Sequence, residues 1–373
     1  MTITVMNYLT DIRFGVGAVR ILSDAMSQLS ITRPLVVTDE GLLSLGILGR
    51  LPCTPAAVFA GVPSNPTEDA VEAGVAVFRE HDCDGLVALG GGSPIDCAKG
   101  IGLATTHTGP LSGYALINGG LSRITSNMPP LIAIPTTSGT GSEVGRGALI
   151  TVRGGTKLGL ISPHLIPSIA ICDPELTLDL PPRLTAATGL DAISHCVETF
   201  CSRKVNPVAD AIALDGLGRA FRSIRAAVHV PQSLHHRTEM MMASLQGGLT
   251  FQKGLGMVHS LSHPLGGLPD KPLHHGTLNA VFLPHVLRFN AEVDSGKMNR
   301  MAEAMNLSTG RNLPEVFERL NRDIGLPARL SEMGVTTDDL SGIPAAAMAD
   351  HSTPSNLREM TEDDCRTLLE TAL

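Results

Sequence analysis

Charged residues are scarce in this sequence. They make up 17% of its 373 residues, no run of lysine and arginine occurs, and the formal net charge is −8. An acidic chain without a basic run is a poor partner for nucleic acid or for an anionic membrane. Hydrophobic residues make up 43%. This composition is typical of a folded globular protein with a large buried fraction.

Paired cysteines and long apolar runs are also missing. The seven cysteines are odd in number, scattered, and form no Cys-x-x-Cys motif, which argues against a disulfide framework or a zinc ribbon. Reduced thiols in a cytoplasmic protein are the simpler interpretation. No stretch of about 18 uninterrupted apolar residues suggests a membrane span. The N-terminus lacks the basic and apolar regions of a signal peptide.

The length suggests two domains. In the first half, short apolar runs at residues 33–39, 56–62, 85–89 and 129–135 alternate with loops and a stretch of helical spacing after residue 67. In that stretch Val71, Val75 and Phe78 share one face. Alternation of strand, loop and helix predicts a parallel sheet with crossover helices.

Strand signals end near Pro181, and helical periodicity takes over. We therefore expect an α/β domain over residues 1–180. An all-helical domain is expected over residues 181–373. The tail after about Asn306 is expected to close the helical domain and to contribute little to catalysis.

The run Gly90-Gly91-Gly92-Ser93-Pro94 follows a predicted strand. Glycines allow a tight turn and a close approach to a ligand. Ser93 is a suitable N-cap and Pro94 a suitable first helical residue, and amides at a helix start favour a phosphate. An ordinary strand-to-helix turn is the alternative. The pattern is not G-x-G-x-x-G, so the usual Rossmann fingerprint is absent.

Two further segments follow predicted strands. Asp39 could bind ribose hydroxyls and favour NAD over NADP, or it could simply cap a turn. The polar run from Pro135 to Glu143 has hydroxyls and glycine amides that suit a nucleotide. Its alternative is a flexible surface loop.

The second half carries two pairs of residues at i, i+4 spacing: Asp191 with His195, and His259 with His263. Residues at this spacing share one helix face. A carboxylate with several imidazoles can coordinate iron(II) or zinc. A single histidine is more often a core or surface residue, but two such pairs and a further histidine site favour a metal.

Taken together, these motifs resemble the iron-containing (group III) alcohol dehydrogenase family. The resemblance rests on GGGSPID, PTTSGTGSE, D-P-x-L-T, G-L-D-A-x-x-H-x-x-E, and H-x-x-x-H followed by H-G-x-x-N. These motifs occur in order between Phe14 and about Asn290. The resemblance implies the fold of dehydroquinate synthase and of iron-containing alcohol dehydrogenases, with an NAD(P) site in the α/β half and a divalent metal in the helical half.

The resemblance also implies site residues. The metal ligands would be Asp191, His195, His259 and His275, and His263 would lie near the nicotinamide and help with proton transfer. The residues implied for cofactor binding are Asp39, Gly91, Gly92, Ser93, Thr136, Thr137, Thr140 and Lys157.

One stretch departs from the family pattern. The segment between His263 and His275 is longer here than in most members, and His274 directly precedes the expected ligand. Gly276 and Asn279 keep the family register and favour His275 as the last ligand, with His274 as the alternative.

The expected reaction is hydride transfer between a small alcohol and a nicotinamide, with the metal as Lewis acid. Asp39 favours NAD over NADP, and the resemblance implies Fe²⁺ with Zn²⁺ as alternative and a homodimer or larger homo-oligomer. Arg146 could pair with a substrate carboxylate, which would favour a hydroxy acid or semialdehyde, although a structural or solvent-exposed role is open. Other functions also stay open: a maleylacetate reductase-like enzyme, more distantly dehydroquinate synthase-like or glycerol-phosphate dehydrogenase chemistry, and a non-catalytic regulator that binds NAD or metal.

Overall fold

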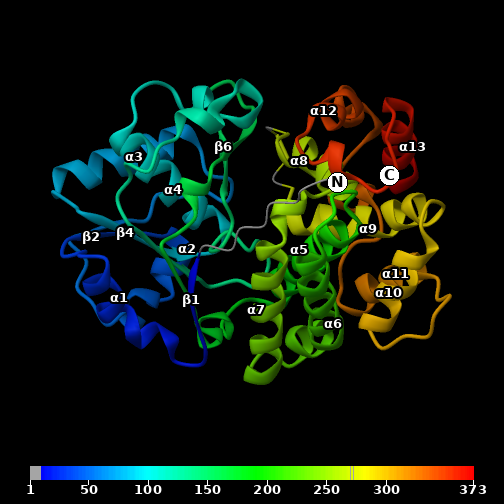
Figure 1. The fold of residues 1–373 in the computed structure, drawn as a ribbon, viewed down its shortest axis with the longest axis horizontal. Coiled ribbons are helices and arrows are strands. Elements are labelled where there is room, and N and C mark those ends of the chain that lie inside the picture. Colours follow the sequence, from blue (N-terminus) through cyan, green and yellow to red (C-terminus); the bar gives the residue numbers. More distant parts are fainter. Residues whose placement is uncertain (1–9, 269, 272) are drawn as a thin grey trace. The chain divides into compact units, whose positions relative to one another are not determined.

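A computed structural model describes residues 10–268, 270–271 and 273–373. The described chain forms two compact units. The α/β unit contains residues 10–137 and 142–177. The helical unit contains residues 138–141 and 178–373. Figure 1 shows strands in the first unit and a bundle of helices in the second.

The α/β unit is built on a six-stranded sheet in the order β1-β8-β5-β4-β2-β3, and every pair in it is parallel. Its strands are β1 (Asp11–Phe14), β2 (Pro34–Val37), β3 (Ala57–Phe59), β4 (Gly85–Gly90), β5 (Leu131–Pro135) and β8 (Ile169–Cys172). The parallel sheet predicted from the sequence is confirmed. β1 and β8 extend it beyond the strands that apolar runs had indicated.

Successive residues of the strands point to opposite faces, so the sheet has two cores. Leu35 and Val37 of β2 belong to one cluster of buried residues, whereas Val36 belongs to the other. A sheet that is buried on both faces explains the continuous apolar runs. The helices of this unit are α1 (Leu22–Gln28), α2 (Glu40–Ser44), α3 (Glu68–Glu80) and α4 (Gly92–Thr106).

Helix α3 has the predicted apolar face, since Val71, Val75 and Phe78 are all buried in the same cluster. Thr67 caps its first turn by accepting a hydrogen bond from the Ala70 amide. The antiparallel hairpin of β6 (Gly147–Thr151) and β7 (Lys157–Ile161) was not predicted. Its strands alternate between buried and half-buried residues, as expected for a sheet with one covered face.

In the described part of the helical unit no strand occurs after Pro182, as predicted. Its helices are α5 (Pro182–Cys201), α6 (Pro207–His229), α7 (Leu234–Leu249), α8 (Met257–Gly266), α9 (His275–Ala291), α10 (Ser295–Ala304), α11 (Leu313–Asp323), α12 (Ile343–Ala349) and α13 (Glu362–Ala372). None of the helices in the described residues is long and apolar enough to cross a membrane.

Helix α5 is the centre of the helical unit, because every residue from Thr185 to Cys201 is buried. It packs against α6, α7 and α9 (Figure 1). A helix covered on all sides must be apolar or have its polar groups bonded within the protein. Asp191, His195 and Glu198 lie in this buried stretch, so the fold fixes their positions tightly.

Glycine at the start of α9 allows that helix to approach α5 closely. A Cβ on Gly276 would lie 2.3 Å from the Ala187 carbonyl oxygen of α5. Because the obstacle is backbone, it cannot rotate out of the way. Gly276 therefore sets how near its neighbour His275 comes to α5.

Gly276→Ala should destabilise the protein by about 1–3 kcal/mol, the usual effect of overpacking a core. Gly266→Ala is the matched control, since its Cβ would meet nothing closer than 3.7 Å and alanine favours a helix. Urea unfolding of both variants measures the effect. A Gly276→Ala protein as stable as the control would contradict the close-packing argument.

Candidate metal centre and nucleotide-binding edge

Four predicted ligand side chains converge inside the helical unit. Asp191 and His195 lie one turn apart on α5, and the Nε2 atom of His195 is 3.4 Å from the Asp191 Oδ1 atom. The Nε2 atom of His259, on α8, is 3.6 Å from the same oxygen. These three residues offer ligand atoms that lie within 4.8 Å of one another, and all three are buried.

His275 is the first residue of α9 and joins this group. Its Nε2 atom lies 3.7 Å from the Asp191 Oδ1 atom, and its ring centroid is 5.2 Å from that of His259. His274 is exposed at the N-cap of α9, where its Nδ1 atom is 3.4 Å from the Thr277 hydroxyl. The segment before it includes residues 269 and 272, so part of the long stretch lies outside the described residues.

The outward-facing ring nitrogens of two of these histidines have hydrogen-bond acceptors. His195 Nδ1 lies 3.1 Å from the Gly139 carbonyl oxygen, and His259 Nδ1 lies 2.5 Å from Glu198 Oε2. Both acceptors require a proton on Nδ1, so in the neutral imidazole the lone pair is on Nε2, the nitrogen that faces Asp191. Histidines that bind metals are held in this way.

Burial and neighbouring charged side chains shift the pKa values of the residues in this group. Burial alone would raise the pKa of Asp191, but the surrounding imidazoles hold it well below its usual range. Burial lowers the pKa of His195 to about 4. For His259 burial acts in the same direction, but Glu198 and Asp191 outweigh it and raise the pKa to about 9.

The donor set fits a divalent cation. With metal–ligand distances near 2.1 Å, the donors of a tetrahedral site lie about 3.4 Å apart, close to the separations from Asp191 given above. The Asn279 Nδ2 atom donates to Asp191 Oδ1 at 2.8 Å and lies 3.2 Å from His259 Nε2 and 3.1 Å from His275 Nε2. Its Oδ1 atom is buried without a partner. The side-chain amide of Asn279 thus lies within hydrogen-bond distance of three atoms that could instead bind a cation.

His263 lies beside this group, and two residues from the C-terminal part of the chain contact it. Its Nδ1 atom is 2.8 Å from Asp350 Oδ2. His351 stacks on its ring with a centroid separation of 5.6 Å. Both residues come from the tail after Asn306, which was expected to contribute little to catalysis.

The predicted phosphate loop lies at the carboxyl edge of the sheet. Helix α4 begins at Gly92, and its N-cap is Gly91, which offers no side chain to its amides. The prediction of Ser93 as the N-cap is therefore wrong, because the helix starts earlier and the Ser93 hydroxyl donates to the Ser64 carbonyl. Uncapped amides at a helix start remain suited to a phosphate.

Two other predicted cofactor residues lie at the same edge of the sheet. Thr136 and Thr137 follow β5, which pairs with β4. A Cβ on Gly91 would lie 3.2 Å from the Thr137 Cγ2 atom. Lys157 begins β7, and its Nζ donates to Asn65 Oδ1 at 3.0 Å. Thr140 belongs to residues 138–141 and therefore to the other unit.

Asp39 follows β2, the other neighbour of β4. Its carboxylate accepts a hydrogen bond from the Leu42 amide and caps α2. Asp39 therefore makes the capping contact that was the alternative to ribose binding. The position of Asp39 at the carboxyl edge is also the place where ligands bind in open parallel sheets.

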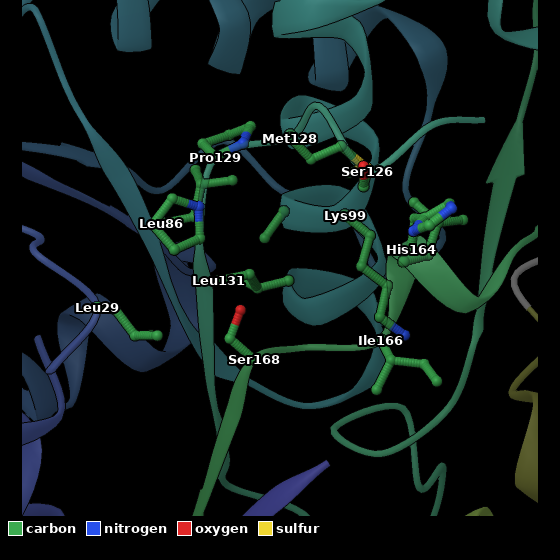
Figure 2. A pocket seen from close by; sticks show the side chains of 14 residues that line it. Leu29, Leu86, Lys99, Ser126, Met128, Pro129, Leu131, His164, Ile166 and Ser168 are labelled. Atoms are coloured by element: carbon green, nitrogen blue, oxygen red, sulfur yellow. The ribbon is translucent and has the colours of Figure 1, made fainter. Parts of the chain in front are cut away.

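Arg146 is exposed, so the suggested pairing with a substrate carboxylate stays a prediction. A cavity of about 340 Å³ in the α/β unit is lined by Leu86, Lys99, Leu131 and Ser168 among others (Figure 2). It lies where β4, β5 and β8 begin, at the edge opposite the predicted phosphate loop. None of the predicted site residues lines it.

Sequence reasoning gave no role to Glu198, Asn279, Asp350 or His351. Glu198 had a usable signal, since it lies seven residues after Asp191 on the same buried face of α5. Asn279 had a similar signal, four residues after His275 on α9. Asp350 and His351 had none, because 87 residues separate Asp350 from His263.

Comparison with known proteins gives matches along nearly the whole chain. The model of the family described as iron-containing alcohol dehydrogenase matches residues 10–174. A second model, for the C-terminal part of Fe-containing alcohol dehydrogenases, matches residues 185–373.

Individual relatives agree with these matches. A 4-hydroxybutyrate dehydrogenase from Cupriavidus necator is 50% identical over 98% of this chain and 99% of its own. The crystal structure of a 1,3-propanediol oxidoreductase has a TM-score of 0.92 and 36% identity over 99% of this chain and 100% of its own. A sulfoacetaldehyde reductase from Bifidobacterium kashiwanohense in complex with NAD⁺ has a TM-score of 0.90 and 26% identity, over 100% and 99%.

Glu198→Gln should weaken metal binding by roughly 10- to 100-fold, the usual effect of losing an acceptor behind a ligating histidine. The carboxylate accepts hydrogen bonds from His259 and from the Val258 amide, and glutamine offers a weaker acceptor. Competition with a chelator measures the affinity. Glu292→Gln, at an exposed pair with Arg358, is the control. Equal affinities for the two variants would exclude this role for Glu198.

Burial lowers the pKa of His351 to about 4, below the value near 6.5 expected in the unfolded chain. As the pH falls from 6.5 to 4, the unfolded state takes up this proton first. Stability present above pH 6.5 is therefore lost, by up to about 1.4 kcal/mol per pH unit.

His351→Phe removes this titration and keeps a stacking ring. In metal-free protein, the free energy of unfolding of the variant should fall less than that of the wild type as the pH is lowered from 6.5 to 4. Urea titrations across this range check the trend. Parallel curves would show that His351 does not titrate as described.

Proposed function

The chain belongs to the iron-containing alcohol dehydrogenase family, and on this premise we propose how its residues perform the family's chemistry. The chain is a metal-dependent, nicotinamide-linked oxidoreductase that acts on small alcohols and the corresponding aldehydes. The observation that carries the assignment of its site is the buried Asp191 carboxylate, onto which three imidazole Nε2 atoms converge.

The proposed metal ligands are Asp191, His195, His259 and His275. A divalent cation in this set would supply Lewis-acid stabilisation of the substrate oxygen, and a bound nicotinamide would accept or return the hydride. Glu198 and the Gly139 carbonyl hold two of the imidazoles in the tautomer that presents Nε2. His263 takes up the hydroxyl proton during oxidation and returns a proton during reduction.

For the cofactor we propose Asp39, Gly91, Gly92, Ser93, Thr136, Thr137, Thr140 and Lys157. The uncapped start of α4 next to Thr137 supports phosphate binding. An acid after β2 favours the ribose hydroxyls of NAD and disfavours the 2′-phosphate of NADP. We propose a domain of residues 1–180 for this function and one of residues 181–373 for the metal and the substrate.

The family description supports Fe²⁺ as the metal, with Zn²⁺ as the alternative that the same ligands accept. All seven cysteines are unpaired, which supports a reducing compartment and hence the cytoplasm. We propose a homodimer or larger homo-oligomer from the family resemblance, and light scattering of the purified enzyme tests it.

For the substrate we propose a small primary alcohol, and as a second candidate a short hydroxy acid. The second rests on the relative named 4-hydroxybutyrate dehydrogenase, which is 50% identical. Initial rates with NAD⁺ and NADP⁺ for 4-hydroxybutyrate and 1,3-propanediol, in Fe²⁺- and Zn²⁺-loaded enzyme, separate the candidates. Turnover of neither compound with either cofactor would refute both.

His275→Ala and His274→Ala form a matched pair for the fourth ligand. His275→Ala should weaken metal binding more than the roughly 10- to 100-fold expected for an outer hydrogen-bond partner, and turnover should be lost with it. His274→Ala should change neither. NADH binding, followed by fluorescence, should persist in both variants. The reverse pattern of metal affinities would assign the ligand to His274.

A further inference from the structure

The structure assigns to Asp350 the role of a positioning residue that holds His263 in one ring orientation and one tautomer for proton transfer. This inference rests on the proposed function of His263 as the proton relay. It concerns a residue of the C-terminal part of the chain that no sequence motif had indicated.

The carboxylate of Asp350 is itself firmly held. Its Oδ2 atom is 2.8 Å from His263 Nδ1, and its Oδ1 atom accepts a hydrogen bond from the Ser352 amide at 2.8 Å. Asp350 directly follows α12, which packs against α8, the helix that carries His263. The side chain of Asp350 is 12% exposed. The position of the carboxylate is therefore set by backbone and by helix packing.

The ring of His263 lies against two other imidazoles. It stacks with His275 at a centroid separation of 5.3 Å and an interplanar angle of 12°. It also stacks with His351 at 5.6 Å and 16°. These nearly parallel rings restrict tilting of the His263 ring, but stacking alone does not prevent a ring flip that exchanges the places of its two nitrogens.

Asp350 removes this freedom. A carboxylate can only accept, so the nitrogen facing it must carry a proton. Nδ1 is that nitrogen, and in the neutral imidazole Nε2 then keeps the lone pair that a proton acceptor needs. A buried aspartate orients the catalytic histidine of serine proteases by the same logic. During alcohol oxidation the hydroxyl proton passes to His263 Nε2 while Nδ1–H stays bonded to Asp350.

The test compares Asp350→Asn, Asp350→Glu, His263→Ala and the double variant His263→Ala/Asp350→Asn, all loaded with metal. An asparagine can present either an acceptor or a donor to Nδ1, so it no longer selects the tautomer. We expect Asp350→Asn to lower kcat by roughly 10- to 100-fold, less than the roughly 100- to 10,000-fold that general acid–base catalysis contributes, because His263 itself is kept. The KM for the cofactor and the metal content should stay unchanged. Asp350→Glu should recover part of the loss.

The double variant separates positioning from a structural role. If Asp350 acts through His263, Asp350→Asn should change kcat less than about twofold in the His263→Ala background, because coupled residues are not additive. Melting temperatures of all variants check that they fold. Asp338→Asn, at an exposed position in the 3-10 helix Thr337–Leu340, is the control.

Three outcomes overturn the inference. The first is an equal loss of kcat from Asp350→Asn in both backgrounds, which would show a structural role. The second is a normal kcat for Asp350→Asn while His263→Ala is impaired. This result would agree with the relay but would refute the positioning role of Asp350. The third is a fully active His263→Ala, which would refute the proposed relay and the inference together.

Discussion

The buried carboxylate of Asp191 is the constraint on which the site depends. Leaving an ionised carboxylate in a protein interior without partners is costly, and the helical unit surrounds this one with the Nε2 atoms of His195, His259 and His275. The small residues Gly139 and Gly276 let a loop and a helix approach α5 closely enough for this. A divalent cation would neutralise the same group of atoms and would satisfy lone pairs that now share the amide of Asn279.

Around this centre, three of the histidines have an acceptor that sets their tautomer. A carbonyl serves His195, the carboxylate of Glu198 serves His259, and the carboxylate of Asp350 lies against His263. Every acceptor contacts Nδ1 and leaves Nε2 for chemistry. Catalysis by orientation requires supports of this kind, because an error of about 1 Å in position can cost about 100-fold in rate. The proposed proton relay, His263, and the proposed ligands His195 and His259 are therefore held by the same kind of contact.

How much the sequence predicted depended on the distance along the chain. The i, i+4 pairs on α5 and α8 and the turns after β4 and β5 are local patterns, and the structure contains them. The boundary of α4 was misplaced, because glycines took the cap position where a serine was expected. The contacts of Asp350 could not be predicted, since they require α12 to return to α8 from far along the chain. The choice of His275 over His274 as the last ligand rests on the register of Gly276 and Asn279 and stays a prediction.

X-ray absorption spectroscopy of the metal-loaded enzyme tests the central claim most directly, because it reports the atoms that bind the ion. We expect one ion per chain with three imidazole nitrogens and at least one oxygen as ligands, and no sulfur. Sulfur among the ligands, or fewer than three imidazoles, would contradict the assignment of Asp191, His195, His259 and His275.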